Sequence, residues 1–196
     1  MTDTVPASSP RRAELLDACY GYVLEHGLVG LSLRPLAATT GTSPRVLLYL
    51  FGSKDNLLRE LLARARQEQI AQVAAMLEPD TGSSGLSVQA DRLWNWLSAP
   101  AQRPMVRLTY EAFLLSLGHD PGPWAGFAAE SARDWLELLC RAQPDTPRVE
   151  AEINATRILA LIRGLLLDLL ASGESARVAA SATFDPARQA GRPAPA

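Results

Sequence analysis

Side chains that can donate hydrogen bonds gather in one short stretch of the sequence, residues 32–54. Arg45 and Tyr49 are four residues apart, so they would share one face of a helix. Lys54, which follows closely, is the only lysine of the chain. Guanidinium, ammonium and hydroxyl groups bind phosphate oxygens, and arginine also binds the major-groove edge of guanine. The stretch therefore has the chemistry of a DNA contact. Its donors are Arg34, Thr42, Ser43, Arg45, Tyr49 and Lys54.

Two short helices joined by a turn are predicted to position these donors. Ser32 is expected to cap the first helix, residues 33–40, and Gly41 supplies the positive φ that ends it. Ser43-Pro44 combines a capping residue with a proline in the first helical turn. This pair predicts the start of a second helix, which runs to Phe51.

The apolar residues of this segment predict how the two helices pack. Ala37 is small enough for the helices to cross closely, and Leu47, Leu50 and Phe51 form an inward stripe at i, i+3 and i+4. This is the pattern of a helix-turn-helix near residues 32–51, which places the start of its second helix in the major groove of DNA. An ordinary pair of helices with glycine in the turn has the same pattern.

Helical periodicity continues through the rest of the chain and predicts an all-α fold of about nine helices. No strand-like alternation interrupts it. Residues 78–85 are rich in turn formers and mark a break, and residues 185–196 are expected to be a disordered tail. The other helices are predicted at about residues 10–26, 53–77, 87–98, 103–118, 124–142, 147–172 and 175–183.

The composition is typical of a soluble globular protein. The chain has 196 residues, 47% of them hydrophobic, and lacks an uninterrupted apolar run of membrane-spanning length. No secretory signal is visible, so a cytoplasmic location is expected. Cys19 and Cys140 are expected to be buried thiols, although a bridge between them is compatible with the sequence. The residue types indicate neither a metal site nor a cofactor.

Charge is distributed unevenly along the chain. Residues 1–66 hold eight basic and six acidic residues, whereas the whole chain has a net charge of −2. A mildly basic N-terminal segment suits contact with a polyanion. A difference of this size also arises by chance.

A set of residues with a specific combined spacing runs from Arg11 to about Gln69. Its members are Leu15, Ala18, Gly27, Gly30-Leu31-Ser32, Arg34, Leu36-Ala37, Gly41, Ser43, Leu47, Phe51, Ser53-Lys54-Asp55 and Leu57-Leu58. The pattern resembles the N-terminal domain of the TetR/AcrR family of transcriptional regulators. The resemblance implies a DNA-binding head at residues 9–69 and a ligand-binding and dimerisation body at residues 70–184. It also implies that the last two long helices pair with their counterparts in a dimer.

The same resemblance implies a set of DNA contacts on the second helix and beside it. The implied positions are Ser32, Arg34, Pro44, Arg45, Val46, Leu48, Tyr49 and Lys54. Two residues depart from the family pattern. The family usually has tyrosine where this chain has Leu48, and often histidine or tyrosine where it has Leu50. Tyr49 is rotated by about 100° around the helix from residue 48, so it need not inherit the expected phosphate contact.

The predicted body holds two further candidate regions. Aromatic side chains are concentrated in residues 86–143, where they either line a ligand pocket or fill the core. The candidate pocket residues are Trp94, Arg107, Tyr110, Glu111, Phe113, Trp124 and Phe127. Residues 147–172 carry an apolar stripe wider than one core face needs, which favours a dimer interface over a central helix of a monomer. The candidate interface residues are Ile158, Ile162, Leu165, Leu166 and Leu169.

These observations favour a ligand-responsive repressor that binds a near-palindromic operator in double-stranded DNA as a homodimer. Its expected partners are the operator, a second copy of the chain and a small-molecule effector, and no membrane is involved. An activator of the same fold and a helical interaction module that reads no DNA are the alternatives. A small helical enzyme is disfavoured, because the motifs expected of a nucleophile elbow, a phosphate loop or a zinc protease do not occur.

Overall fold

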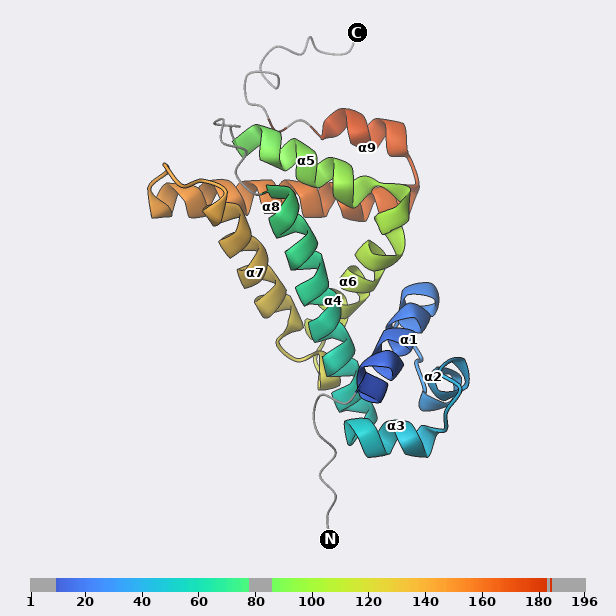
Figure 1. The fold of residues 1–196 in the computed structure, drawn as a ribbon. Coiled ribbons are helices and arrows are strands. Elements are labelled where there is room, and N and C mark those ends of the chain that lie inside the picture. Colours follow the sequence, from blue (N-terminus) through green and yellow to red (C-terminus); the bar gives the residue numbers. More distant parts are fainter. Residues whose placement is uncertain (1–9, 78–85, 183, 185–196) are drawn as a thin grey trace. The chain divides into compact units, whose positions relative to one another are not determined.

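The structure is a computed structural model that describes residues 10–77, 86–182 and 184. Within these residues the fold consists of nine α-helices and two short 3₁₀ helices (Figure 1), which confirms the all-α prediction. The α-helices are α1 Pro10–His26, α2 Leu33–Thr39, α3 Pro44–Phe51, α4 Lys54–Leu77, α5 Leu86–Ser98, α6 Arg103–Ser116, α7 Phe127–Arg141, α8 Arg148–Ser172 and α9 Ser175–Ser181. None of these helices is both long enough and apolar enough to cross a bilayer.

The helix boundaries differ from the predicted ones by a few residues, most clearly at the start of α7. The helix expected from residue 124 begins only at Phe127, because Gly126 has a φ of +84° and follows a 3₁₀ turn at Gly122–Trp124. Ser32 occupies the N-cap position of α2 with an extended backbone, but its side chain makes no capping hydrogen bond, so that prediction was wrong. The predicted turn at 78–85 and tail at 185–196 lie outside the described residues.

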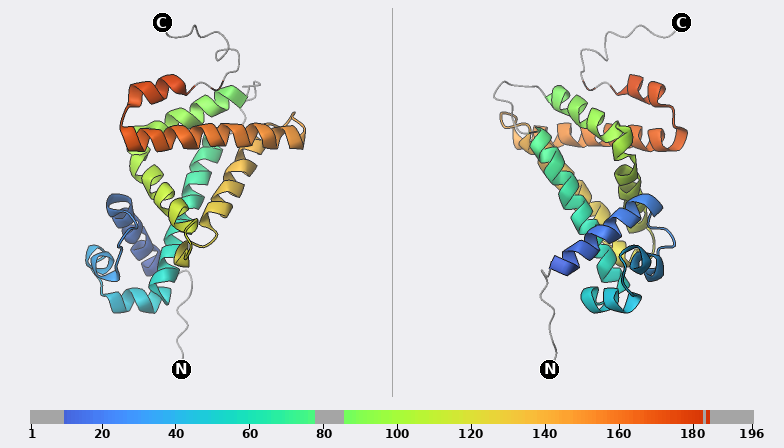
Figure 2. Two further views of the ribbon diagram at one scale, coloured as in Figure 1. Left: turned by 180° about the vertical axis from the view of Figure 1, so that it is seen from behind. Right: turned by 45° about the vertical axis from the view of Figure 1, so that its right-hand side comes forward.

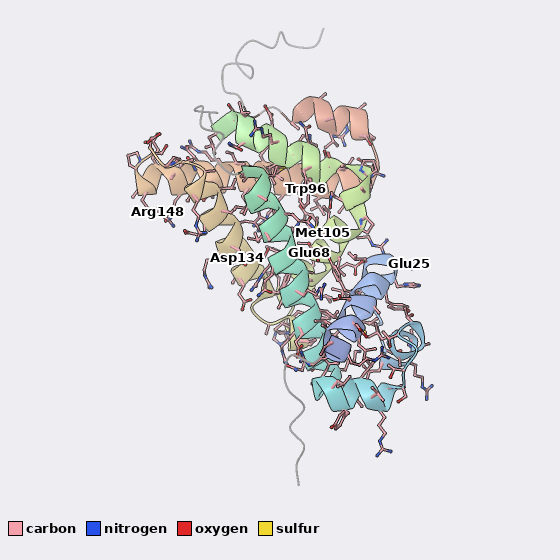
Figure 3. All side chains as sticks on the ribbon, in the orientation of Figure 1. Glu25, Glu68, Trp96, Met105, Asp134 and Arg148 are labelled. Carbon is pink, nitrogen blue, oxygen red and sulfur yellow. The ribbon has the colours of Figure 1, made fainter. Side chains whose placement is uncertain are left out.

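The chain divides into two compact units. Unit 1 comprises the described residues 10–68 and 107–129, and unit 2 comprises the remainder. Glu68, Met105 and Asp134, labelled in Figure 3, lie near the points where α4, α6 and α7 pass from one unit to the other. The domain boundary predicted near residue 69 stays a prediction. Residues 107–129, assigned to the body from sequence, pack with the N-terminal helices.

The core of unit 1 joins its N-terminal helices to part of α6. On α1 the buried residues Leu15, Cys19 and Val23 recur every four positions, as expected for one helix face. They pack with Leu36 and Ala37 of α2, Leu47 and Phe51 of α3, Leu57, Leu58, Leu61 and Leu62 of α4, and Leu108, Ala112 and Phe127. Ring and aliphatic groups therefore fix α2 and α3 from the inside.

A carboxylate of α6 attaches to the end of α1. Glu111 Oε2 accepts a 2.7 Å hydrogen bond from the backbone N–H of Leu28, and Glu111 Oε1 lies 3.3 Å from Nε of Arg107. Gly27 has a φ of +79°, and a Cβ at this position would lie 2.8 Å from the same carboxylate. Glycine is therefore required here both for the backbone conformation and for the close approach of Glu111.

Unit 2 is organised around α8. In both views of Figure 2, α5 and α9 run beside α8. The inner side of α8 buries Ala155, Leu159, Ile162, Leu166 and Leu169, and α5 buries Ala90, Leu93, Trp94 and Leu97. These residues form the apolar interior of the unit.

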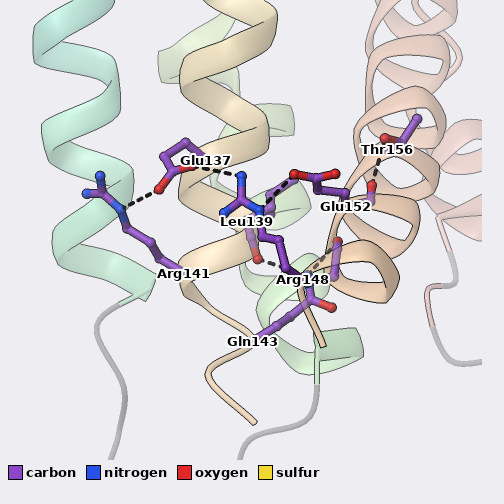
Figure 4. A network of polar contacts seen from close by, with 8 residues as sticks. Glu137, Leu139, Arg141, Gln143, Arg148, Glu152 and Thr156 are labelled. Carbon is purple, nitrogen blue, oxygen red and sulfur yellow. Dashed lines mark hydrogen bonds and ion pairs between the residues drawn. The ribbon is translucent and has the colours of Figure 1, made fainter. Parts of the chain in front are cut away.

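A polar network fixes the connection between α7 and α8 (Figure 4). Glu137 accepts hydrogen bonds from Arg141 and Arg148, at 3.2 and 3.1 Å, and Arg148 also donates to Glu152 at 2.7 Å. Hydrogen bonds from the two arginines hold the pKa of Glu137 below its ordinary value. Beneath them the buried Gln143 amide donates to the carbonyls of Leu139 and Ala151. The start of α8 is thereby tied to the end of α7.

Both cysteines are free thiols, and we expect neither to react while the protein is folded. Cys19 has no exposed surface, and burial raises the pKa of its thiol to about 11. Burial also raises the pKa of the Cys140 thiol. Because the thiolate is the nucleophile, an aromatic disulfide reagent at pH 8 should label neither thiol of the native protein within minutes and both in denaturant. Rapid labelling of the native protein would contradict the described burial.

Candidate nucleic-acid interface

The turn between α2 and α3 has the geometry of a glycine-terminated helix end. Gly41 has a φ of +62°, its N–H donates to the carbonyl of Ala38, and the N–H of Thr42 donates to Ala37 at 2.9 Å. These two bonds satisfy carbonyls that the end of α2 would otherwise leave unpaired. The Ser43 hydroxyl then accepts a 3.3 Å hydrogen bond from Val46 N, which caps α3. The predicted serine cap of this helix is therefore present.

The two faces of α3 differ sharply. Leu47 and Phe51 are buried in the core of unit 1 and Leu50 packs against it. On the opposite side Tyr49 is 62% exposed and Leu48 is 40% exposed. The helix thus has an inner face that fixes its position and an outer face that is free for contact.

All the predicted contact residues lie in unit 1 and are at least partly exposed. Ser32, Arg34, Ser43, Arg45, Val46, Leu48 and Tyr49 are exposed, and Thr42, Pro44 and Lys54 are half-buried. These side chains are therefore accessible to a partner. They belong to α2 and the residue before it, to α3 and the turn before it, and to the first turn of α4. Their role in binding stays a prediction.

The cations of this surface differ from other arginines of unit 1 in their pairing. Arg11, Arg12, Arg64 and Arg107 form ion pairs with Glu14, Glu60, Asp17 and Glu111. Within the described part of the chain, Arg34, Arg45 and Lys54 have no ion-pair partner, and the exposed Arg59 on α4 has none either. Unpaired cations beside an exposed helix face are available for an anionic partner. Sequence reasoning did not select Arg59, because the absence of a partner is visible only in three dimensions.

Several known proteins with a similar sequence or fold are transcriptional regulators. No family model matches the chain. The HTH-type transcriptional regulator BetI of Burkholderia mallei (strain NCTC 10229) is 26% identical over 164 residues, which cover 84% of each chain. A TetR transcription regulator from Haloarcula marismortui ATCC 43049 superposes with a TM-score of 0.71 at 16% identity, covering 89% of this chain and 94% of that one. The chain is a transcriptional regulator of the TetR type.

Two further solved structures of similar fold contain bound small molecules. The multidrug binding protein EbrR, complexed with imidazole, is 26% identical with a TM-score of 0.64, covering 95% of this TetR-type chain and 97% of EbrR. A transcriptional regulator from Saccharomonospora viridis, in complex with choline, is 19% identical with a TM-score of 0.70, covering 89% and 94%. The fold of this TetR-type regulator is thus one in which small molecules have been observed.

The residues predicted to line an effector pocket are distributed over both units of this TetR-type regulator. Trp94 is buried in unit 2, whereas the other six belong to unit 1. Phe127 is part of the unit 1 core and Trp124 packs against it, as the alternative reading of the aromatic residues had it. The Glu111 carboxylate is occupied by Leu28 N and Arg107. The pocket itself stays a prediction.

A separate hollow lies in unit 2. It has a volume of about 470 Å³ and is lined by Leu86, Ser87, Asn154, Arg157, Ile158, Leu161 and Phe184. Of the residues selected from sequence, Ile158, a dimer candidate, lines this hollow. None of the predicted pocket residues does.

The apolar residues of α8 divide between an inner and an outer side of the helix. Ile162, Leu166 and Leu169, predicted at a dimer interface, are buried within unit 2, and Ile158 and Leu165 are half-buried. The outer side instead presents residues at alternating spacings of four and three. They are Ile153, Arg157, Ala160, Gly164, Leu167 and Ala171, all exposed. We call this set the α8 seam. Such spacing is typical of a helix that packs along a second helix.

Proposed function

We propose that this TetR-type regulator represses transcription as a homodimer that binds a near-palindromic operator. One observation carries the proposal: α3 combines a buried inner face with an exposed outer face. The outer face has hydrogen-bond donors and cations that have no ion-pair partner among the described residues. Arg45, in the first turn of α3, would bind guanine or phosphate in the major groove. Val46 and Leu48, both 40% exposed, suit apolar contact with thymine methyl groups.

The dimer would form through the α8 seam. Gly164 lies in the middle of a 25-residue helix, where glycine costs about 1 kcal/mol relative to alanine. A Cβ at this position would meet no atom within 4 Å, so the packing of a single chain does not require glycine there. A second helix crossing at this point would require it, because small residues allow helix backbones to approach closely. A two-fold dimer then presents two copies of α3 to successive turns of DNA.

Effector control is the third part of the proposal. Structures of similar fold bind imidazole and choline, which supports a small-molecule effector for this chain without identifying it. An effector that binds one conformation more tightly than another would shift the population away from the DNA-binding state. A thermal-shift screen of small cationic and apolar compounds, followed by release of bound DNA, tests this part alone.

DNA binding is tested by selecting duplexes from a random-sequence library and measuring their affinity across a range of salt concentrations. We expect a near-palindromic consensus, specific protection of that sequence at moderate salt, and a linear fall of log affinity with log salt. Repression is tested by placing the selected operator in a promoter with a reporter gene. Absence of any sequence preference would instead favour the interaction-module alternative, to which the apolar Leu48 lends support.

Replacing Arg45 by alanine should lower the affinity for the selected operator by about tenfold or more, since a bidentate base contact contributes about 1–3 kcal/mol of discrimination. Arg45 is exposed and has no ion-pair partner among the residues that the structure describes, so the melting temperature and the dimer should be unaffected. Arg133→Ala is a suitable control, because Arg133 is an exposed arginine of unit 2 without an ion-pair partner among the described residues. Equal affinity of Arg45→Ala and the unmodified protein would remove Arg45 from the contact set.

A further inference from the structure

We propose that Arg12, Asn56 and Glu60 form a clamp that fixes the orientation of α3, and that Arg12 is a positioning residue for DNA recognition. The proposal rests on the proposed function and goes beyond it, because none of the three residues is among the predicted DNA contacts. The clamp lies entirely within unit 1. It joins residues from the first turn of α1 and the first two turns of α4 to the last turn of α3.

The clamp supplies hydrogen-bond donors to the end of α3. The carbonyl groups at a helix C-terminus have no donor within their own helix. Here the Leu50 carbonyl accepts a 3.2 Å hydrogen bond from Nε of Arg12, and the Phe51 carbonyl accepts a 3.0 Å bond from Nδ2 of Asn56. The last two carbonyls of α3 are therefore held by one side chain from α1 and one from α4.

A single carboxylate holds both donors in place. Nη2 of Arg12 lies 2.6 Å from each oxygen of Glu60, and Nδ2 of Asn56 lies 2.9 Å from Oε1 of Glu60. The Arg12 guanidinium also lies over the ring of Phe51, 4.7 Å from its centroid. Each member thus contacts at least one other member and, through Arg12 and Asn56, the end of α3.

The environment of Arg12 distinguishes it from its neighbour. The side chains of Arg12 and Glu60 are 18% and 26% exposed, whereas those of the Arg11–Glu14 pair are 60% and 66% exposed. Partly buried, charge-assisted hydrogen bonds are stronger than surface ion pairs, which contribute little. The Arg12 guanidinium is therefore committed to contacts within the protein, and its effect on DNA must pass through α3.

The shortness of α3 explains why such a clamp is needed. The helix has eight residues, too few to be stable or firmly oriented alone. It is about 12 Å long, so a tilt of roughly 10° about its C-terminal end moves its N-terminal residues by about 2 Å. A displacement of that size breaks a hydrogen bond to a base edge. Fixing one end of α3 therefore sets the position of Arg45 at the other.

The test compares Arg12→Gln with Arg11→Gln in the full chain. Affinity is measured for a duplex selected by the unmodified protein and for a random duplex, each across a range of salt concentrations. We expect Arg12→Gln to lower the affinity for the selected duplex by about tenfold and to leave the salt slope and the random-duplex affinity unchanged. Arg11→Gln should change neither affinity by more than about twofold.

Three results would overturn the clamp. Unchanged affinity of Arg12→Gln for the selected duplex rejects the positioning role. A salt slope smaller by about one per protomer identifies Arg12 as a phosphate contact instead. Equal losses in both variants assign the effect to lost positive charge at the start of α1.

A second measurement keeps the proposal testable without DNA. Hydrogen exchange at the backbone amides of residues 45–52 is compared between the unmodified protein and Glu60→Gln, a variant that keeps the side-chain size. We expect faster exchange in this segment of the variant and no change in unit 2, and unchanged exchange in α3 rejects the clamp. Failure of the unmodified protein to select any duplex would instead reject the proposed function. The clamp would then be tested by the hydrogen-exchange comparison alone.

Discussion

Phe51→Ala should lower the free energy of unfolding of unit 1 by about 3–5 kcal/mol, the usual cost of deleting a buried aromatic ring. Phe51 is 2% exposed and belongs to the core that joins α1, α3, α4 and part of α6. Its removal leaves a cavity, and it also takes away the ring beneath the Arg12 guanidinium. Urea unfolding followed by circular dichroism measures the loss. Operator binding should be lost with it.

Leu48→Ala is the matched control, because Leu48 lies on the same short helix with 40% of its surface exposed. Its unfolding free energy should stay within about 0.5 kcal/mol of the unmodified value, as for most surface substitutions. A similar loss of unfolding free energy in both variants would contradict the structure, in which Phe51 is on the buried face of α3 and Leu48 is on the exposed face.

Gly164→Arg should raise the dissociation constant of the dimer by about 100-fold or more. A charge left buried without a partner at an interface costs about 2–5 kcal/mol, as the truncation of one member of a buried charge pair shows. The new arginine would be such a charge, and two-fold symmetry would place two of them in the α8 seam. In the single chain Gly164 is exposed and an added Cβ would meet no neighbouring atom within 4 Å. The substitution also replaces a poor helix former, so the monomer should not be destabilised. Sedimentation equilibrium over a range of concentrations measures the constant.

Gly21→Arg provides a matched control for this substitution. Gly21 is also a helical glycine whose added Cβ would meet nothing within 4 Å, but it lies on α1 in unit 1. It receives the same charge and the same gain in helix propensity. A dimer that survives Gly164→Arg, or that dissociates equally in both variants, would place the interface elsewhere than the α8 seam.

The features that sequence reasoning predicted correctly depend on residues close together in the chain. Buried leucines at helical spacing, positive-φ glycines such as Gly41 and the Ser43 cap are local signals, so the helices were placed nearly where they occur. The exposure of Arg45 and Tyr49 also follows from the periodicity of α3. Ser32 shows the limit of such signals, since its position and backbone suit a cap but its hydroxyl makes no bond.

The features that were missed depend on residues far apart in the chain. Arg12 and Glu60 are 48 positions apart, and Leu28 and Glu111 are 83 apart, so no local pattern relates them. For α8, an apolar stripe wider than one face indicated two packing surfaces but not which residues belong to which. The interior of unit 2 takes Ile162 and Leu166, and only the packing of α5 against α8 reveals that Gly164 and Leu167 remain outside.

The bond from Leu28 to Glu111 has a consequence for protein engineering. Unit 1 is completed by residues 107–129, which follow about forty residues after its first segment ends at Glu68. These residues supply Leu108, Ala112 and Phe127 to the core, and they supply the Glu111 carboxylate that binds Leu28. A chimera that joins residues 10–68 to a foreign effector domain would leave the Leu28 amide without its acceptor and the α1 core uncovered. Grafts that carry residues 107–129 along with the N-terminal helices should fold and bind the operator. A library of sensor chimeras based on this chain is therefore best divided at the boundary between the two units, which is discontinuous in sequence.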